Sequence, residues 1–598
     1  MPAGDELSDL ALLRRFEPVI KYTQGELFLP GDVNDYVGSA SLQAARRNGP
    51  VEVLAARGTL TLDSLASLGR KQAGDKLYLT FVDRPLDRGE FKAWKKDPER
   101  PRFTPSSRFA AVGILSRLID SLMRMTLILR GKVPGGYAAA AALRMRSLPS
   151  AGVHPYYGHV SRDGGYIILQ YWYFYAMNDW RSTFGGVNDH EADWEQVTVF
   201  LVDQESVEPT PAWVAFSSHD EVGDDLRRRW DDPDIEFVGQ HPVVYAGAGS
   251  HSGAYLPGEY IVSIEAPLPG LVEKARRAIL RILPWTDPDA PGIGIPYIDY
   301  RRGDGPSIGA GQPLDWSPVL ITDDVAWVRH YRGLWGLDTK DPLGGERAPA
   351  GPRFDRDGTT RESWGQPVAW AGLDKEAPSD ARAVVDLTAY QAVLTANLSV
   401  IDLELATARA ALRGARAVDR AAGLSSRHPS PVTTAHQKTV TELRRKQGTT
   451  VTELEAIDRG LNESLPVDPV HDHLKHRATP PADSGATRGR RGWLLRLWSA
   501  ASASILLAAI GIILLLPDLP VLAPVLILLG AMIIIEAVLR GRVLHLIGAV
   551  LVAIVVLLAV LAIVDLFVGR FRISMGILLA VAALYMLWQT VRESVRTR

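Results

Sequence analysis

One short stretch of this sequence brings together the residue types that bind metal ions. Asp189, His190, Glu191, Asp193 and Glu195 place four acids and a histidine within seven positions, with an apolar run on either side. Such a cluster is either a solvated loop or a group that surrounds a positive charge. The choice between these two interpretations decides what chemistry is open to the protein.

The cluster leads into a predicted strand, DWEQVTVFL. Because side chains alternate along a strand, Asp193 and Glu195 should share one face with Val197, Val199 and Leu201, the face that points into a core. Two carboxylates beside a core repel each other and lose hydration. They must therefore take up protons or be neutralised by a cation.

Two histidines complete a predicted metal site. His190 lies just outside the strand and can turn back toward the carboxylates, and His251 sits in the Gly- and Ser-rich loop YAGAGSHSGAY, which permits close approach. We predict that His190, Asp193, Glu195 and His251 bind one divalent cation. Oxygen ligands would favour Ca²⁺, Mg²⁺ or Mn²⁺, and more imidazoles would favour Zn²⁺. In the alternative, the acids form a solvated loop and His190 is a hydrogen-bonding turn residue.

Short strands must position these residues. Residues 1–380 contain apolar, aromatic and β-branched runs separated by Gly, Pro, Asp and Asn, among them YIILQYWYFYAM, EQVTVFLV, AWVAFSSH and PVVYAGAG. This pattern predicts a mainly β-sandwich domain. A long apolar run interrupted by charges, around 107–147, predicts a helical insertion with one apolar face. Other histidines fall in the same region: His154, His159, His219 and His241.

Several segments of this region resemble the vacuolar protein sorting-associated protein 62 family. They are LRRFEPVIKYTQGELFLPGDVNDYV, LQYWYFYAMND, NDHEADWEQVTVFL, VVYAGAGSHSGAY and YRGLWG with the later PAGP, in that order. The HxxDWE element of His190, Asp193, Trp194 and Glu195 is also similar to the heptapeptide of the necrosis-inducing protein family. There the matching histidine, aspartate and glutamate surround a divalent cation in a β-sandwich. The resemblance implies the fold and the metal site, and no settled biochemical activity.

The C-terminal part, residues 493–598, is strongly apolar. Four runs are each long enough to cross a hydrocarbon core of roughly 30 Å as a helix, and they lie at 499–516, 519–539, 543–568 and 573–591. We therefore predict four transmembrane helices that contact the lipid bilayer in a multi-pass protein of the cell membrane. Arginines gather before the first run, between the second and third, and after the fourth. The N-terminal domain and the C-terminus are accordingly predicted to be cytoplasmic.

Between these parts the composition changes. Residues 381–465 show helical apolar spacing with frequent charges, broken once by GLSSRHPSPVTT, and predict a helical hairpin or short coiled coil that can self-associate. Residues 466–492 form a polar, Pro-rich linker to the apolar part. Its three histidines, His471, His473 and His476, are predicted to be solvated.

Bulk composition limits the function classes. The net charge of −2 over 598 residues gives no reason to expect a nucleic-acid partner. The absence of cysteine excludes disulfides and thiolate metal sites. The N-terminal residues lack the basic start and apolar core of a secretory signal, so none is expected.

Three functions are compatible with these features. The first is a multi-pass membrane protein that presents a cytoplasmic, cation-binding β-sandwich for recognition. The second is a membrane-tethered, metal-dependent hydrolase, in which His251 or a nearby acid takes a proton from metal-bound water. The third is a membrane-perturbing effector. We expect the first, because no nucleophile or general base accompanies the cluster; a deep pocket with an open coordination position would favour the hydrolase.

Overall fold

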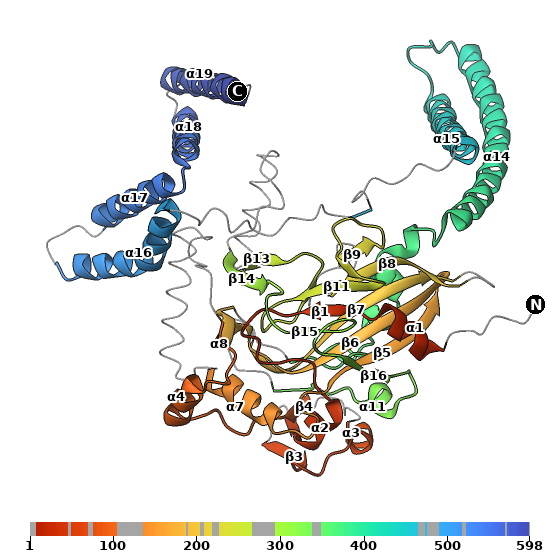
Figure 1. Ribbon diagram of the computed structural model, residues 1–598. Helices are drawn as coiled ribbons and strands as arrows, with labels where there is room; N and C mark the ends of the chain where they lie inside the picture. Colours follow the sequence, from red (N-terminus) through yellow and green to blue (C-terminus); the bar gives the residue numbers. More distant parts are fainter. Residues whose placement is uncertain are drawn as a thin grey trace, which may run out of the picture. The chain divides into compact units, whose positions relative to one another are not determined.

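The computed structural model describes most of the chain (Figure 1). The described residues are 8–45, 50–69, 76–103, 135–186, 189–203, 208–217, 226–265, 294–337, 348–463, 473–474, 490–516, 522–567 and 571–596. Most of the predicted insertion of 107–147 and most of the predicted linker of 466–492 lie outside these ranges.

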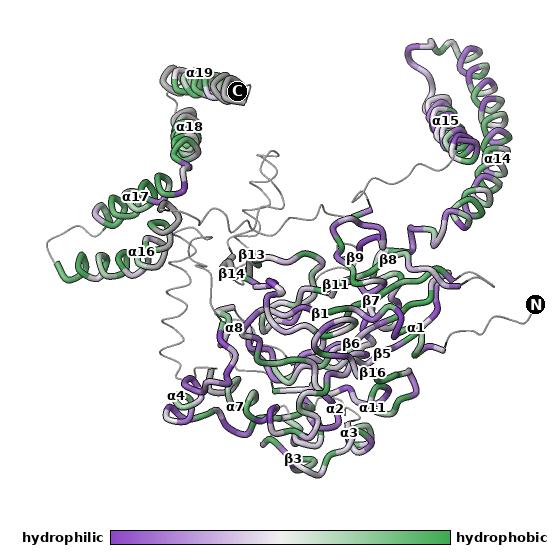
Figure 2. The backbone as a smooth tube through the Cα atoms, viewed as in Figure 1, coloured by the Kyte–Doolittle hydropathy of each residue, from purple (hydrophilic) through white to green (hydrophobic). Residues whose placement is uncertain are grey.

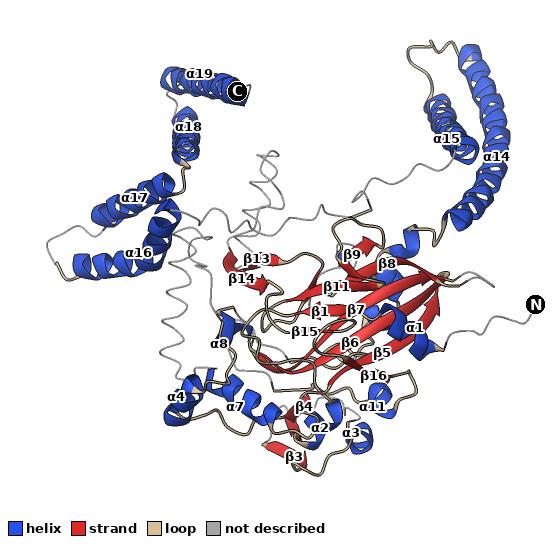
Figure 3. Cartoon of the chain, in the orientation of Figure 1, coloured by secondary structure: helices blue, strands red, loops and turns tan. Residues whose placement is uncertain are grey.

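A six-stranded sheet forms the centre of the N-terminal part (Figure 3). Its strands lie in the order β16 (Trp316–Leu320), β5 (His154–Asp163), β6 (Tyr166–Asn178), β7 (His190–Val202), β8 (Thr210–Phe216) and β9 (Arg227–Arg229). The β16–β5 pair is parallel, and the other pairs are antiparallel. All residues of β6 and β7 are buried, as expected of central strands covered on both faces.

A second sheet packs against one face of the first. It contains β10 (Phe237–Val238), β11 (His241–Ala246), β1 (Val19–Lys21) and β15 (Ser307–Ile308), with β12 (Gly253–Ala254) paired to β11. Ile20, Val244 and Ile308 of this sheet share one buried core with Tyr171 and Val199 of the first. Two sheets that face each other across a common core are what the prediction of a sandwich requires.

The alternation predicted for β7 is observed. Val197, Val199 and Leu201 lie in the core between the two sheets. Trp194 and Phe200 belong to apolar clusters on the opposite face. The predicted carboxylates, at alternate positions on the first of these faces, therefore point toward the second sheet.

Helices and a small sheet cover the other face of the six-stranded sheet. The helices are α2 (Val33–Gly38), α3 (Leu62–Leu68), α7 (Gly135–Arg146) and α11 (Ala326–His330), and the small sheet has the order β3 (Val51–Ala55), β2 (Ser41–Ala45) and β4 (Lys76–Thr80). Their shared core contains Phe81, Phe174, Trp194, Trp327 and Trp335. The domain thus has a layer beyond the predicted sandwich, and α7 is the described end of the predicted insertion.

Several short elements complete this part of the chain. They are α1 (Asp9–Phe16), α4 (Arg88–Lys96), α8 (Trp180–Phe184), α12 (Glu362–Gly365), α13 (Pro367–Trp370), the 3-10 helix η1 (Leu373–Lys375) and a pair of strands, β13 (Gly258–Glu265) and β14 (Gly294–Arg301).

Strand β9 buries charge that the sequence does not mark as buried. Arg227 and Arg228 are at most 3% exposed. Arg227 Nη1 donates a 2.8 Å hydrogen bond to the carbonyl of Ala371, and its guanidinium lies over the ring of Trp213. The same ring meets His473 edge-on at 5.1 Å, so the prediction that this histidine is solvated is wrong.

Two long antiparallel helices follow, α14 (Asp380–Ala421) and α15 (Pro431–Glu463). They occupy the range expected for the helical hairpin. Buried aliphatic side chains join them: Leu405, Val440 and Leu443.

The four C-terminal apolar runs are helical. They form α16 (Arg490–Leu514), α17 (Leu522–Leu539), α18 (Val543–Phe567) and α19 (Phe571–Arg596), of which α17 and α18 are almost wholly hydrophobic (Figure 2). Among the described residues, two helices are long and apolar enough to cross a membrane, α17 and, unexpectedly, α14. The other C-terminal helices contain shorter apolar stretches, at 504–514, 546–561 and 575–588. The expectation of four spans is therefore met only in part: these helices indicate membrane association, and the multi-pass arrangement stays a prediction.

Replacing Trp194 tests the packing of the helical layer on the sheet. Its ring lies 5.2 to 6.2 Å from four aromatic rings, those of Tyr157, Phe174, Trp327 and Trp335. Trp194→Ala should lower the free energy of unfolding by about 3–5 kcal/mol, because a large buried side chain is lost. Thermal unfolding followed by circular dichroism measures this. Val53→Ala, on an exposed strand position, should change stability by less than about 0.5 kcal/mol; equal effects of the two changes would contradict the packing.

Candidate functional site

The four residues predicted to bind a metal are all buried. His190, Asp193 and Glu195 lie on β7, and His251 lies in the loop between β11 and β12. Each is at most 3% exposed. The alternative interpretation, a loop of solvated acids, is therefore wrong for these residues.

Asp193 and His251 are in direct contact. His251 Nδ1 lies 3.0 Å from Asp193 Oδ2, which also accepts a 3.1 Å hydrogen bond from Asn178 Nδ2. The other ring nitrogen, Nε2, lies 3.7 Å from Glu26 Oε1. The imidazole stacks on the ring of Tyr175, with centroids 3.8 Å apart and planes within 5°. His251 is thus held between two carboxylates and against an aromatic ring.

Glu26 is the member of this group that the sequence did not single out. Its Oε1 accepts hydrogen bonds of 2.9 and 3.2 Å from the backbone N–H groups of Leu27 and Phe28. Its Oε2 accepts a 2.9 Å hydrogen bond from the N–H of Gly249. The sequence marked Glu26 only by its place in the family-like segment YTQGELFLPGDV. A lone glutamate forms no residue pattern that would link it to a histidine more than two hundred residues away.

The backbone holds His251 in an unusual conformation. Its φ of 56° is costly for a residue other than glycine, and its N–H donates a 2.8 Å hydrogen bond to the carbonyl of Gly247. Gly249 has a φ of 69°, and a Cβ at this position would lie 2.7 Å from the nitrogen of Trp180 and 2.8 Å from Asp179 Oδ1. The loop therefore needs glycine where it passes the carboxylates, as its composition suggested.

Two further acids lie at this end of the sandwich. Asp179 follows β6 and Asp189 precedes β7, and both are fully buried. Asp189 Oδ1 accepts hydrogen bonds of 2.9 and 3.2 Å from the backbone N–H groups of Arg181 and Ser182. Asp179 accepts a hydrogen bond from the hydroxyl of Thr183. Asp179 and Asp189 thus add two buried carboxyl groups to those of Asp193 and Glu26 at this end of the sandwich.

His251 carries a positive charge at neutral pH. Burial lowers the pKa of its imidazole, but the carboxylates of Asp193 and Glu26 outweigh burial and raise that pKa to about 10. Burial, and then the charges of Glu26 and Asp189, raise the pKa of the Asp179 carboxyl well above its ordinary value. The pKa values of His251 and Asp179 are thus both raised by the buried negative charge at this end of the sandwich.

His190 and Glu195 have other neighbours. His190 Nδ1 forms a 2.7 Å hydrogen bond with the carbonyl of Ala192, a residue whose φ of 58° turns the backbone back on itself. Glu195 pairs across the sheet with Tyr173. Its charge acts on Arg361, where burial lowers the pKa of the guanidinium and nearby carboxylates, Glu195 among them, oppose this.

The predicted metal site is not assembled in this geometry. Within the described ranges, no three His, Cys, Asp or Glu side chains are grouped so that they could hold a metal ion. Of the predicted set of His190, Asp193, Glu195 and His251, Asp193 and His251 lie within hydrogen-bonding distance of each other. The divalent cation expected from spacing and from the resemblance therefore stays a prediction.

Glu191 serves the opposite side of the sheet. Its Oε1 accepts hydrogen bonds from the N–H groups of Phe81 and Val82 and from the hydroxyl of Tyr137, and its Oε2 accepts one from the N–H of Leu337. Burial raises the pKa of this carboxyl, and the four hydrogen bonds work against that rise. Glu191 therefore connects β7 to the layer that covers it through hydrogen bonds.

Three other histidines singled out in the sequence, His154, His159 and His241, have structural partners. Each has a ring nitrogen within 3.1 Å of an oxygen: Pro30 O for His154, Gln170 Oε1 for His159 and Glu17 O for His241. His219 lies outside the described residues.

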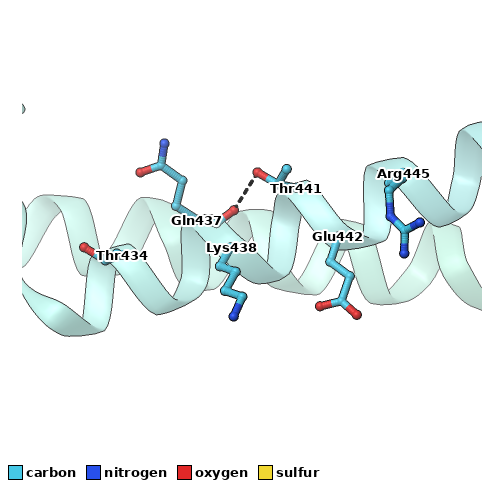
Figure 4. A pocket seen from close by; sticks show the side chains of 6 residues that line it. All are labelled: Thr434, Gln437, Lys438, Thr441, Glu442 and Arg445. Carbon is cyan, nitrogen blue, oxygen red and sulfur yellow. Dashed lines mark hydrogen bonds between the residues drawn. The ribbon is translucent and has the colours of Figure 1, made fainter. Parts of the chain in front are cut away.

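Two open hollows lie on the surface of the helical hairpin. One runs along α15 (Figure 4) and is lined by Thr434, Gln437, Lys438, Thr441, Glu442 and Arg445. In it the hydroxyl of Thr441 donates a 2.9 Å hydrogen bond to the carbonyl of Gln437. A second lies between α14 and α15 and includes Arg409, Arg413 and Arg444. Both have a basic lining.

The charge on His251 predicts a pH-dependent stability. Its folded pKa of about 10 lies above the unfolded value of about 6.5, so its contribution is complete below pH 6.5 and disappears as the pH rises through 10. His251→Gln should therefore cost more at pH 6 than at pH 10, by on the order of a few kcal/mol. Denaturant unfolding at both pH values measures the difference. His428→Gln, on an exposed loop, is the matched control; a cost for His251→Gln that is the same at both pH values would show that the imidazole is neutral.

No protein-family model matches the chain, and no curated protein or solved structure matches it either. The resemblance to the vacuolar protein sorting-associated protein 62 family therefore stays a prediction, and the geometry described above carries the functional proposal.

Proposed function

We propose that the protein is a membrane-attached binding protein and not a hydrolase. The observation that carries this proposal is the burial of the acidic cluster. A hydrolytic site needs a position that water and substrate can reach. Asp193 and His251 are 0% and 2% exposed, and each is the other's hydrogen-bond partner.

The cluster holds three segments of the chain together. Glu26 ties the chain after β1 to Gly249, Asn178 ties the end of β6 to Asp193, and His251 joins both through its two ring nitrogens. Loops held by a rigid scaffold are the usual place for recognition on sandwiches, and ordered loops lose less entropy when they bind. We therefore assign recognition to the loops at this end of the sandwich.

Attachment to the membrane is assigned to the C-terminal helices. α17 exposes large aliphatic side chains, with Leu522 and Ile527 both 72% exposed. Such a surface is unfavourable in water and favourable in hydrocarbon. We propose that α16–α19 all enter the bilayer of the cell membrane and that the sandwich and the C-terminus face the cytoplasm, following the distribution of arginines.

A divalent cation is the second candidate for balancing the cluster. Four buried acids exceed the positive charge that one imidazolium supplies, and the pKa of the Asp179 carboxyl is raised well above its ordinary value. A cation would compete with any protons bound by these groups, so its binding would release them.

Elemental analysis distinguishes a cluster without a metal ion from a cluster that binds a divalent cation. We expect the full chain, purified with Ca²⁺, Mg²⁺, Mn²⁺ and Zn²⁺ supplied, to contain no ion in a one-to-one ratio, and EDTA to leave its melting temperature unchanged. One ion per chain that is lost in Asp193→Asn would establish the cation site instead. An ion retained in Asp193→Asn would place the metal away from this cluster.

Charges introduced into α17 test the anchor. Ile527→Arg with Ile534→Arg should reduce the fraction of full chain that stays with membranes after carbonate extraction, since each arginine at a helix centre costs about 2.5–3.5 kcal/mol of insertion. Val385→Arg with Val393→Arg in α14 is the control, because α14 also meets the length and hydropathy criteria but is assigned to the hairpin. If only the α14 substitutions reduced the fraction retained with membranes, α14 and not α17 would be the membrane anchor.

A further inference from the structure

The helical hairpin has a strong charge asymmetry along its length. The end that contains the connection, residues 405–447, has nine Lys or Arg against two acids, a net charge of +7 with histidine neutral. The other end, residues 380–404 with 448–463, has eight acids against two Arg, a net charge of −6. The hollows lined by Arg409, Arg413 and Arg444 lie at the basic end.

α14 also has a second apolar face. Its first includes Leu405, which is buried against α15. On the opposite side of the helix runs a row of uncharged, exposed residues at spacings of three and four: Val385, Ala389, Ala392, Ala396, Val400, Leu403, Thr407, Ala411, Gly414 and Val418. Leu403 and Val418 are 71% and 68% exposed. An apolar row on both sides is typical of a helix that packs between two partners.

The outer row is symmetric about the point between residues 401 and 402. Counted outward from that point, its members form five equivalent pairs: 400 with 403, 396 with 407, 392 with 411, 389 with 414 and 385 with 418. Two antiparallel α14 helices related by a two-fold axis at this point would therefore place row against row over the whole length. Ala, Gly and Thr fill the positions between the larger central and terminal side chains, so the helix axes can approach closely.

Charge selects the antiparallel direction. Within α14, residues 380–404 have a net charge of −3 and residues 405–421 a net charge of +3. An antiparallel pair sets the acidic half of each helix beside the basic half of the other, whereas a parallel pair sets like charges side by side.

We infer that the outer face of α14 is an interface for α14 of a second copy of this chain, in an antiparallel, two-fold arrangement with both α15 helices on the outside. The apolar row and the charge asymmetry support this independently, because neither feature requires the other. A polyanion bound at the basic end is the competing occupant, and it explains the charge but not the symmetric apolar row.

Introduced cysteines test the arrangement directly, because the chain has none of its own. In the full chain in detergent, Val400→Cys should form a disulfide dimer, since position 400 lies near the axis. Val385→Cys alone should not, because the two copies of position 385 would lie about 50 Å apart along the helices. A mixture of Val385→Cys and Val418→Cys chains should cross-link. Self-cross-linking of Val385→Cys would mean a parallel pair, and no cross-link at any position would mean no pair; either result overturns the inference.

Two further variants distinguish the α14 dimer from polyanion binding. Leu403→Glu should convert the dimer to a monomer in light scattering of the full chain, with unchanged helical circular dichroism because the side chain is exposed in the hairpin. Val432→Glu, at a position on α15 that is 60% exposed, is its control. Asp380→Arg with Asp386→Arg should weaken the dimer by about tenfold, because it places like charges beside the partner's basic half. A chain that is monomeric in every form, whatever its affinity for anionic vesicles, would overturn the inference in favour of the polyanion.

Discussion

The end of the sandwich that holds the acidic cluster depends on one electrostatic constraint, the neutralisation of the carboxylate of Asp193. This group is buried on a central strand, on the face that also carries the aliphatic core. Water cannot solvate it there, so the chain must bring a donor or a positive charge to it. His251 does so from a loop on the other sheet. The contact with the Asp193 carboxylate offsets the conformational cost of the left-handed backbone at His251.

That constraint extends outward through the neighbouring segments. The imidazolium needs a second carboxylate, Glu26, which in turn needs three backbone N–H groups, one of them from Gly249. The glycine has to pass close to Asp179, a fully buried carboxyl whose pKa is raised by burial and by the charge of Glu26. A single acid on β7 is thereby linked to the conformation of segments that lie far apart in the sequence.

Part of this arrangement could be predicted from the sequence. The alternation on β7 identified the faces of Asp193 and Trp194, and the two long charged helices followed from their apolar spacing, because both depend on local periodicity. The composition of the loop singled out His251, but its partner Glu26 has no local signal. The hydrogen bond of His190 with a backbone carbonyl could not be predicted, because it depends on the positive φ of Ala192, which the residue types there do not indicate. The helical layer was missed because its small sheet and short helices have little periodicity of their own.

The order of strands in the second sheet has a consequence for biosynthesis. β1, near the N-terminus, pairs with β11 in parallel and with β15 on its other side, more than two hundred residues later. The first strand must therefore wait for residue 308 before its sheet can close, which takes roughly 15 to 60 s at ribosomal speed. Over that interval Glu26 has no imidazolium beside it. The nascent chain thus exposes an unpaired strand edge until most of the domain has been made.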